Sequence, residues 1–271
     1  MDQRQAASTA PAGDQAVLLR EDRDGIAWLT LNRPAARNAL SVGLMAALQA
    51  ALDAISRDRA IKVVVIAANG PGFCAGHDLR EMRANPGRAI YEKLFTQCAN
   101  LMISIVKLPQ PVIARVHGIA TAAGCQLVAS CDLAVAADDA RFATPGVNIG
   151  LFCSTPMVAL SRAVSRKPAM EMLLTGEMIS AQQARDWGLI NRVVAPASLD
   201  AEVTKLAQQI SSKSPLVVKI GKQAFYRQAE LGLDVAYAYA SEVMTTNMLA
   251  RDAEEGIDAF LQKRPPVWEN R

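Results

Sequence analysis

The apolar residues of this chain change their spacing several times, and each change predicts a new element. Residues 16–20 and 25–31 have the pattern of strands, and the turn-forming residues 21–24 between them indicate a hairpin. From Ser41 onward, apolar residues recur every three or four positions, which predicts a helix of about four turns with Ser41 as its cap. The chain therefore begins as a strand pair followed by a helix.

Strands and helices then alternate. Residues 62–67, 111–116 and 132–136 are short runs of β-branched or small apolar residues, as in strands that are covered on both faces. Helical spacing in residues 88–107 and 122–130 separates these runs. Strand, helix, strand alternation is typical of a mostly parallel sheet in an α/β protein.

The second half of the chain is predominantly helical. Residues 155–164 and 168–175 have helical spacing, and the second segment ends at Gly176. Ser180 and Gln183 then form a capping box, which predicts another helix start.

We predict three parts: a disordered tail (1–15), a core domain (16–196) and a C-terminal helical oligomerisation region (197–271). The last part is expected to hold three or four helices. Its apolar content around residues 231–249 exceeds what a lone pair of surface helices needs, which favours packing on neighbouring subunits over an ordinary bundle within the chain.

Composition narrows the classes of partner. The chain has 271 residues, 51% hydrophobic and 20% charged, so it can bury a large core, and its net charge of +3 is spread out. Lys263-Arg264 is the only dense basic patch, so no nucleic acid partner is expected. No apolar run approaches the ~18 residues of a membrane helix, so no membrane partner is expected.

The five cysteines are scattered and odd in number, which predicts reduced thiols and a cytoplasmic location. The polar first sixteen residues fit a frayed tail, with a transit peptide as the alternative. Cys74 and His77 have metal-ligand spacing, but His117 is the only other histidine, so no metal is expected.

Two glycine-marked segments carry the candidate chemistry. Residues 73–79 follow one predicted strand, and residues 117–126 follow the next. In each, a strand ends at a tight turn and a helix begins, which leaves unpaired N–H groups at the turn. Two such turns facing each other would hold one carbonyl oxygen.

These segments and three further motifs resemble the crotonase, or enoyl-CoA hydratase/isomerase, superfamily. The likeness extends from Val17 to Trp268, and five motifs occur in the order found in the family. The motifs are residues 31–40, 73–82, 107–114 leading into 124–126, 172–176, and 184–189.

The resemblance implies an α/β fold: a crotonase-like (ClpP-type) spiral of ββα repeats with a C-terminal helical trimerisation region. It also implies a homotrimer or a dimer of trimers. The implied partner is an acyl-CoA or enoyl-CoA thioester in fatty-acid-type metabolism, so coenzyme A enters with the substrate and no separate cofactor is expected. The thioester oxygen would lie between the main-chain N–H groups of His77 and Ala123.

The same alignment shows a departure from the family pattern. Hydratases of this family hold and split water with two glutamates, and those positions are Gln126 and Gly146 here. Neither residue exchanges a proton near neutral pH, although Gln126 can still orient water or a thioester. The His77 imidazole is the remaining acid or base candidate, with helix capping or solvent exposure as the alternative. Replacing both positions by glutamate is expected to raise hydration of a short enoyl-CoA.

The resemblance also implies a coenzyme A site along one loop. Its residues are Arg37, Ala75, Asp78, Leu79 and Arg80. Phe260 and Lys263 match a pair that in relatives reaches the coenzyme A of an adjacent subunit. Asp78 and Glu81 are also expected to stabilise the start of the helix that follows the first turn.

Two classes of function therefore remain open. The first is an enzyme that polarises a CoA thioester by chemistry other than two-glutamate hydration, or with weak hydratase or isomerase activity. The second is a binding or regulatory protein that keeps the pocket without turnover. A serine peptidase is disfavoured because no serine lies in a turn near Ala123. RNA binding is disfavoured because the chain has no basic stripe.

Overall fold

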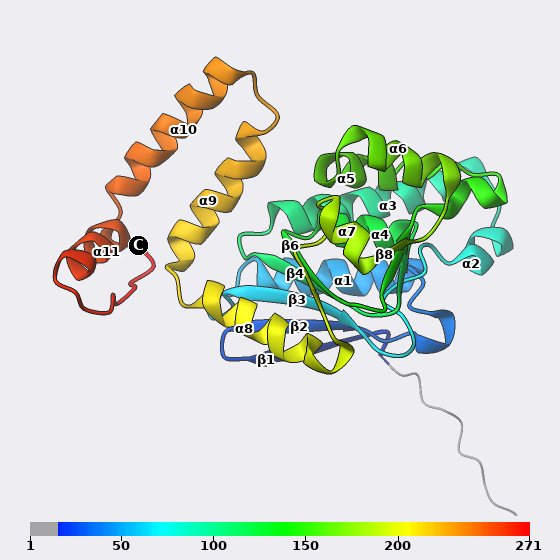
Figure 1. Ribbon diagram of the computed structural model, residues 1–271, viewed down its shortest axis with the longest axis horizontal. Coiled ribbons are helices and arrows are strands. Elements are labelled where there is room, and N and C mark those ends of the chain that lie inside the picture. Colours follow the sequence, from blue (N-terminus) through cyan, green and yellow to red (C-terminus); the bar gives the residue numbers. More distant parts are fainter. Residues whose placement is uncertain (1–15) are drawn as a thin grey trace, which may run out of the picture.

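A six-stranded sheet forms the centre of the described part of the chain, residues 16–271, in this computed structural model (Figure 1). The predicted tail, residues 1–15, lies outside the described residues. β1 and β2 are antiparallel and every other neighbouring pair is parallel, as the alternation of elements predicts. The strands, in spatial order, are β1 (Leu18–Arg23), β2 (Ile26–Leu31), β3 (Val63–Ala68), β4 (Val112–Val116), β6 (Leu133–Ala137) and β9 (Arg192–Val194).

Alternate side chains of β3 pack on opposite faces of this sheet. Val64 and Ile66 belong to the larger apolar core, and Val63 and Val65 to a second one. The helices on the larger side include α1 (Val42–Ile55), α3 (Arg88–Lys107) and α4 (Ala123–Ser130), whereas α8 (Leu199–Ser211) covers the other face.

The position of α8 corrects the predicted boundary at residue 197. Leu199 and Val203 are buried against Ile26 and Val63 of the sheet. Because α8 closes one face of the core, the core domain continues through this helix. The projecting helices begin only after it, at Pro215.

A second sheet of three short strands was not predicted from the sequence. It consists of β5 (Ile119–Thr121), β7 (Arg141–Ala143) and β8 (Ile179–Ser180). Strands of two or three residues are too short to show a hydrophobic period. Main-chain bonds hold them: the Arg141 N–H donates to Gly118 O at 2.8 Å, and the Ala122 N–H donates to Ala143 O at 2.9 Å.

The predicted helix signals have the expected geometry. Ser41 Oγ accepts from the Leu44 N–H, and Ser180 Oγ from the Gln183 N–H, both at 3.1 Å. Gly176 ends its helix with a positive φ of 66°. The remaining core helices are α2 (Leu79–Ala84), α5 (Pro156–Ala163), α6 (Arg166–Thr175), α7 (Ala181–Asp186) and the 3₁₀ turns η1 (Pro34–Ala36), η2 (Pro145–Ile149) and η3 (Pro196–Ser198).

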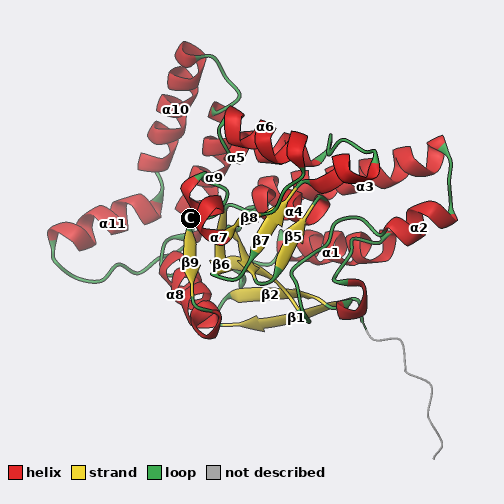
Figure 2. Cartoon of the chain, turned by 45° about the vertical axis from the view of Figure 1, so that its right-hand side comes forward, coloured by secondary structure: helices red, strands yellow, loops and turns green. Residues whose placement is uncertain are grey.

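Three helices project from the core and form what we call the arm: α9 (Pro215–Gln228), α10 (Leu233–Met248) and α11 (Arg251–Leu261) (Figures 1 and 2). The arm exposes many large apolar side chains. They are Phe225, Leu233, Val235, Tyr237, Met244, Met248, Leu249, Ile257, Phe260 and Leu261. Apolar surface of this extent is typical of an interface with another protein chain.

One buried polar cluster, which we call the anchor, fastens the arm to the core. Lys222 Nζ donates to Asp132 Oδ2 at 2.7 Å and to the carbonyl oxygens of Ile105 and Gln110, each at 3.0 Å. Tyr226 donates its hydroxyl to Asp132 Oδ1 at 2.9 Å. Burial lowers the pKa of Lys222, and the Asp132 carboxylate opposes that shift.

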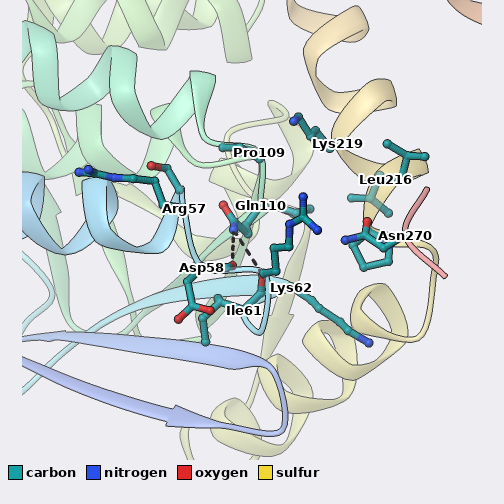
Figure 3. A pocket seen from close by; sticks show the side chains of 14 residues that line it. Arg57, Asp58, Ile61, Lys62, Pro109, Gln110, Leu216, Lys219 and Asn270 are labelled. Atoms are coloured by element: carbon teal, nitrogen blue, oxygen red, sulfur yellow. Dashed lines mark hydrogen bonds between the residues drawn. The ribbon is translucent and has the colours of Figure 1, made fainter. Parts of the chain in front are cut away.

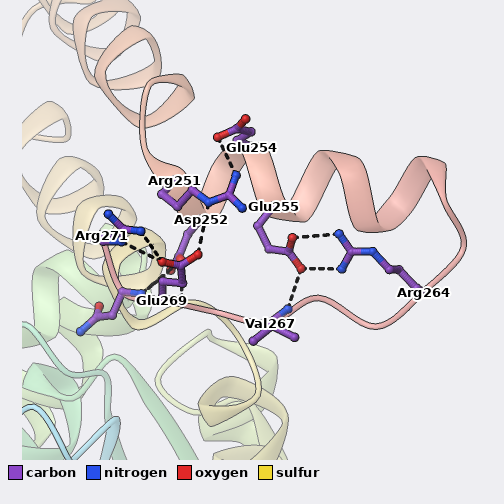
Figure 4. Close-up of polar contacts among 9 residues, drawn as sticks. Arg251, Asp252, Glu254, Glu255, Arg264, Val267, Glu269 and Arg271 are labelled. Carbon is purple, nitrogen blue, oxygen red and sulfur yellow. Dashed lines mark hydrogen bonds and ion pairs between the residues drawn. The ribbon is translucent and has the colours of Figure 1, made fainter.

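The C-terminal segment folds back along α11 (Figure 4). Glu255 forms a two-pronged ion pair with Arg264, and its Oε1 accepts the Val267 N–H at 2.8 Å. Asp252 Oδ1 accepts the Glu269 N–H at 2.7 Å, and its other oxygen accepts from the Ser214 hydroxyl. The chain end is thereby tied to the start of α9.

Residues 16–271 contain neither a membrane-spanning helix nor a metal-binding cluster. No helix there is both long and apolar enough to cross a membrane, and no three His, Cys, Asp or Glu residues are grouped so as to hold a metal ion. All five cysteines lie in this part of the chain as free, buried thiols.

Candidate functional site

The two glycine-marked turns lie in direct contact. The Cys74 N–H donates to Ile119 O at 3.0 Å, and the Thr121 N–H donates to Cys74 O at 2.9 Å. These bonds join the segment after β3 to β5, which leads into α4. The strand order explains the contact, because β3 and β4 are adjacent and parallel, so both segments leave the same edge of the sheet.

Glycine is required where the two turns touch. A Cβ on Gly124 would lie 2.1 Å from Cys74 O, which no structure tolerates. A Cβ on Gly76, whose φ is 99°, would lie 2.9 Å from the Ala122 Cβ and 3.4 Å from the Ala123 nitrogen. The segment carrying His77 is therefore held against the first residue of α4.

The main-chain N–H groups of His77 and Ala123 have no acceptor among the described residues. The groups on either side of His77 are paired: Leu40 N–H donates to Gly76 O at 2.7 Å, and Asp78 N–H donates to Leu40 O at 3.2 Å. Ala123 is the first residue of α4, where N–H groups have no partner within the helix. Each turn thus contributes one main-chain donor without an acceptor in residues 16–271.

Ala122 sets the direction of the second donor. Its φ of 50° and ψ of −119° lie in a region that side-chain-bearing residues rarely occupy. Such a backbone costs on the order of 1–3 kcal/mol and persists only where its surroundings enforce it. The bond from the Ala122 N–H to Ala143 O supplies that enforcement.

Two side chains beside these turns also hold unpaired polar atoms. His77 Nε2 and Thr144 Oγ1 are sealed from solvent without a hydrogen-bond partner among the described residues. The His77 ring packs edge-on against Phe95, with centroids 5.6 Å apart. Burial lowers the pKa of His77 to about 4, so the imidazole is neutral near pH 7 and cannot serve as a general acid there.

A groove of about 800 Å³ lies along α3 next to this ring. Phe95 belongs to both the groove wall and the contact with His77. Arg88 and Glu92 form an exposed ion pair at 2.7 Å in the same wall. The other lining residues are Tyr91, Thr96 and Ala99.

The two positions that carry glutamate in hydratases have other contacts here. Gln126 is buried, and Cys98 Sγ lies 3.9 Å from its Oε1. A Cβ on Gly146 would lie 2.6 Å from Leu151 O and 2.9 Å from Cys153 Sγ. Gly146 therefore has no room for a larger residue unless the segment after it moves. Restoring glutamate at both positions therefore needs a shift of the segment after Gly146, and the expected gain in hydration stays a prediction.

The structure gathers the five loop residues of the predicted coenzyme A site. The Ala75 N–H donates to Arg37 O at 3.0 Å. Asp78 Oδ1 caps α2 by accepting the Arg80 and Glu81 N–H groups, and its Oδ2 binds Arg33 Nη2 at 2.9 Å. Although burial raises the pKa of Asp78, these bonds outweigh it and lower the pKa below its ordinary value. Leu79 and Arg80 lie exposed at the start of α2.

Phe260 and Lys263 lie far from the five loop residues of the predicted coenzyme A site. Phe260 is 82% exposed near the end of α11, and Lys263 follows that helix. The arm carries both to the side of the molecule opposite α2 (Figure 1). They cannot reach the turns of their own chain in this arrangement.

The family follows from the whole chain. A model of the enoyl-CoA hydratase/isomerase family matches residues 21–271, so this protein belongs to that family. Among curated relatives, the human enoyl-CoA hydratase domain-containing protein 3, mitochondrial, is 52% identical over 90% of this chain and 81% of its own. The 2,3-dehydroadipyl-CoA hydratase of Escherichia coli is 37% identical, covering 94% and 98%.

Solved structures agree. An enoyl-CoA hydratase from Mycobacterium smegmatis is 56% identical with a TM-score of 0.91, covering 93% of this chain and 98% of that one. The human enoyl-CoA hydratase domain-containing protein 3 is 50% identical with a TM-score of 0.91, covering 93% and 100%. The predicted crotonase-like α/β fold with a C-terminal helical region is confirmed.

One prediction is overturned. The cytoplasmic location that we inferred from the cysteines is contradicted by the relatives, since the rat, mouse and human proteins are named as mitochondrial. Scattered free thiols indicate a reducing compartment, but they do not indicate which one, so they could not identify the cytoplasm.

Three features of the site were missed: Phe95, Thr144 and the strained backbone of Ala122. Phe95 reads as an ordinary apolar position of a helix. The Thr144 hydroxyl and the Ala122 dihedrals have no counterpart in residue spacing. The only sign of strain at Ala122 in the sequence is that an alanine stands in a turn that favours glycine.

Proposed function

We propose that this protein binds acyl-CoA or enoyl-CoA thioesters and polarises the thioester carbonyl between the main-chain N–H groups of His77 and Ala123. The observation that carries the proposal is a pair of unpaired donors on two touching turns. Retaining a buried unpaired donor costs about 1–3 kcal/mol, so such groups persist where a ligand uses them.

The two donors act on charge that develops on the thioester oxygen. When electrons move onto that oxygen, to form an enolate or after attack at the β-carbon, fixed donors stabilise it without reorganising. By analogy with known oxyanion holes, each donor lowers the activation barrier by about 3–4 kcal/mol. Coenzyme A enters as part of the ligand, held by the loop containing Arg37, Ala75 and Arg80.

We further propose that efficient two-carboxylate hydration is not its reaction. Gln126 has no acidic proton to exchange, and Gly146 has neither a side chain nor space for one. General acid and base catalysis each contribute about 10²–10⁴ in rate, so hydration of a short enoyl-CoA should be slow. An isomerase or lyase reaction on a CoA thioester remains compatible with the donors.

The second candidate is a CoA-ester-binding protein without turnover. The buried His77 imidazole favours it, because its lowered pKa makes this ring a weak base and leaves it uncharged near pH 7. For either candidate, we propose a homotrimer or dimer of trimers, supported by the apolar surface of the arm. Phe260 and Lys263 would then serve the site of an adjacent subunit.

Replacing Ala123 by proline tests the central claim. Proline at the first residue of a helix removes one N–H while leaving the helix intact. We expect Ala123→Pro to lose stabilisation by acyl-CoA esters in thermal unfolding and to lose any turnover in a mass-spectrometric panel of acyl- and enoyl-CoA esters.

Ala181→Pro is the matched control, since Ala181 is also the first residue of a helix, α7, and is also buried. It should bind and turn over as the unmodified protein does. A folded Ala123→Pro variant with unchanged affinity and turnover would contradict the proposal. Binding without product across the panel would favour the second candidate.

The Gln126→Glu variant tests the hydration claim alone. Glutamate has nearly the shape of glutamine, so the variant should fold, yet hydration of crotonyl-CoA should stay slow because the second acid is still missing. A gain of a hundredfold or more, about what general acid-base catalysis supplies, would overturn the claim that two carboxylates are needed.

A further inference from the structure

A cavity of about 260 Å³ lies at the end of the sheet opposite the two turns (Figure 3). Lys62 comes directly before β3, and Pro111 comes directly before β4. The turns follow the other ends of these same strands. Three segments, residues 56–62, 109–111 and 215–219, form the walls together with Asn270. The cavity therefore lies where core loops meet the first turns of the arm.

The charge around this cavity is strongly unbalanced. Arg57, Arg59, Lys62 and Lys219 line it, against one carboxylate, Asp58. Within residues 16–271, none of the four cations lies within 4.0 Å of a carboxylate. Asp58 itself has a cation outside the cavity lining, Arg20, at 3.8 Å. Clustered charges of one sign around a concave surface raise the local concentration of small ions of opposite sign.

The cavity walls are held in place by Gln110. Its side-chain amide donates to Ile55 O at 2.9 Å and to the carbonyls of Asp58 and Ile61, each at 3.3 Å. The main-chain carbonyl of Gln110 accepts Lys222 Nζ of the arm at 3.0 Å. Gln110 thus joins the loop after α1 to the arm, and Figure 3 shows its two bonds to that loop.

We propose that this cavity binds a small phosphate-bearing anion that bridges the core and the arm. Phosphate oxygens take several charge-assisted hydrogen bonds at once, which matches guanidinium and ammonium groups without a carboxylate partner on separate segments. Of these groups, Arg57 already donates its Nε–H to Asp53 O at 3.1 Å. Arg59 belongs to a core loop, and Lys219 lies on α9. A bound phosphate group contacting both would resist separation of the arm from the core.

The site is separate from the proposed coenzyme A loop. Arg37 and Arg80 lie at the other end of the strands, beside the two turns. Two anion sites on one chain therefore need variants that distinguish them. Arg59→Gln/Lys219→Gln removes two cations of the cavity, and Arg80→Gln removes one of the loop. Lys205→Gln, an exposed lysine on α8, is the control for a general loss of positive charge.

The experiment is calorimetric titration of the full chain with inorganic pyrophosphate and, separately, with ADP, at 0.15 M salt. We expect pyrophosphate to bind, and the double variant to weaken it by about tenfold or more, since each lost charge-assisted bond is worth up to about tenfold. Lys205→Gln should bind as the unmodified protein does, and Arg80→Gln should keep the binding that the double variant loses. Pyrophosphate should also raise the midpoint of thermal unfolding except in the double variant.

The ADP titration identifies the source of the phosphate group. Tighter binding of ADP than of pyrophosphate, lost in the double variant and kept in Arg80→Gln, would support a nucleotide as the ligand of this cavity. Equal or weaker binding of ADP would support a free phosphate species. The proposal is overturned if neither probe binds, if the double variant binds as tightly as the unmodified chain, or if Arg80→Gln abolishes binding.

Discussion

The anchor and the two turns are both buried and polar, yet they treat their hydrogen bonds in opposite ways. In the anchor, Lys222 donates to three oxygens, and both Asp132 oxygens are occupied. At the turns, the main-chain donors of His77 and Ala123 have no acceptor in the described chain.

The difference indicates what each region is for. Paired buried groups hold two elements in one geometry, and removing one partner is costly because the other stays buried. Unpaired main-chain donors and a strained residue such as Ala122 both lower the free energy of unfolding. We therefore infer that the two turns keep these donors to bind a ligand. Removing a bond of the anchor should therefore lower the free energy of unfolding, whereas relieving strain at the turns should raise it.

The largest effect is expected from Lys222→Met. Methionine keeps most of the buried chain length but leaves Asp132 and two carbonyls without their cation, so unfolding free energy should fall by about 3 kcal/mol. Urea denaturation measures this loss. Lys219→Met, three residues earlier on the same helix and exposed, should change it by less than about 0.5 kcal/mol. Equal effects of the two changes would remove the special role of the anchor.

A smaller effect is expected from pH at the turns. The neutral His77 imidazole has a pKa of about 4 in the folded protein, against about 6.5 in the unfolded chain. The unfolded state therefore binds the proton first. Above about pH 6.5, His77 is neutral in both states and does not change the free energy of unfolding. As the pH falls from 6.5 toward 4, protonation of the unfolded chain lowers that free energy.

Between pH 7 and pH 5 this loss amounts to about 2 kcal/mol. Urea unfolding at both pH values should show it as a difference between the unmodified protein and His77→Gln, because other titrating groups are common to both. Parallel pH dependence of the two proteins would show that the ring is not held neutral by burial.

The smallest effect is expected from Ala122→Gly, and it is a gain. Glycine relieves backbone strain of about 1–3 kcal/mol and loses about 0.4–1 kcal/mol to the flexibility of the unfolded chain. The net stabilisation should be about 1 kcal/mol by urea denaturation. Ala129→Gly, inside the helix α4 that follows Ala122, should destabilise the protein by about 0.5–1 kcal/mol. A loss at both positions would refute the assignment of strain to Ala122.

Most of the main sheet and most core helices could be predicted from the sequence, because each has either a long apolar period or a capping residue. The helix at residues 88–107 has both its ends where the spacing places them. The strands near Ala120 and Phe142 could not be predicted, since main-chain bonding to distant segments forms them. The division between α8 and the arm was missed because both have the same helical spacing.

The candidate site was predictable in part for a similar reason. Gly76 and Gly124 can be recognised in the sequence as turn residues. The structure explains why they are glycines, because a Cβ at either position would lie too close to the other turn. The burial of Lys222 leaves no such trace, because a single lysine on a helix resembles any solvated lysine. Its role depends on a carboxylate ninety residues earlier in the chain.

The crowding around Gly146 has a consequence for how this protein can evolve. The carbonyl oxygen of Leu151 lies 2.6 Å from where a side chain at this position would begin. A glutamate there could be accommodated only if the segment carrying Leu151 moved at the same time. Regaining the hydratase pair therefore requires prior remodelling of a neighbouring segment, which makes the present chemistry hard to reverse.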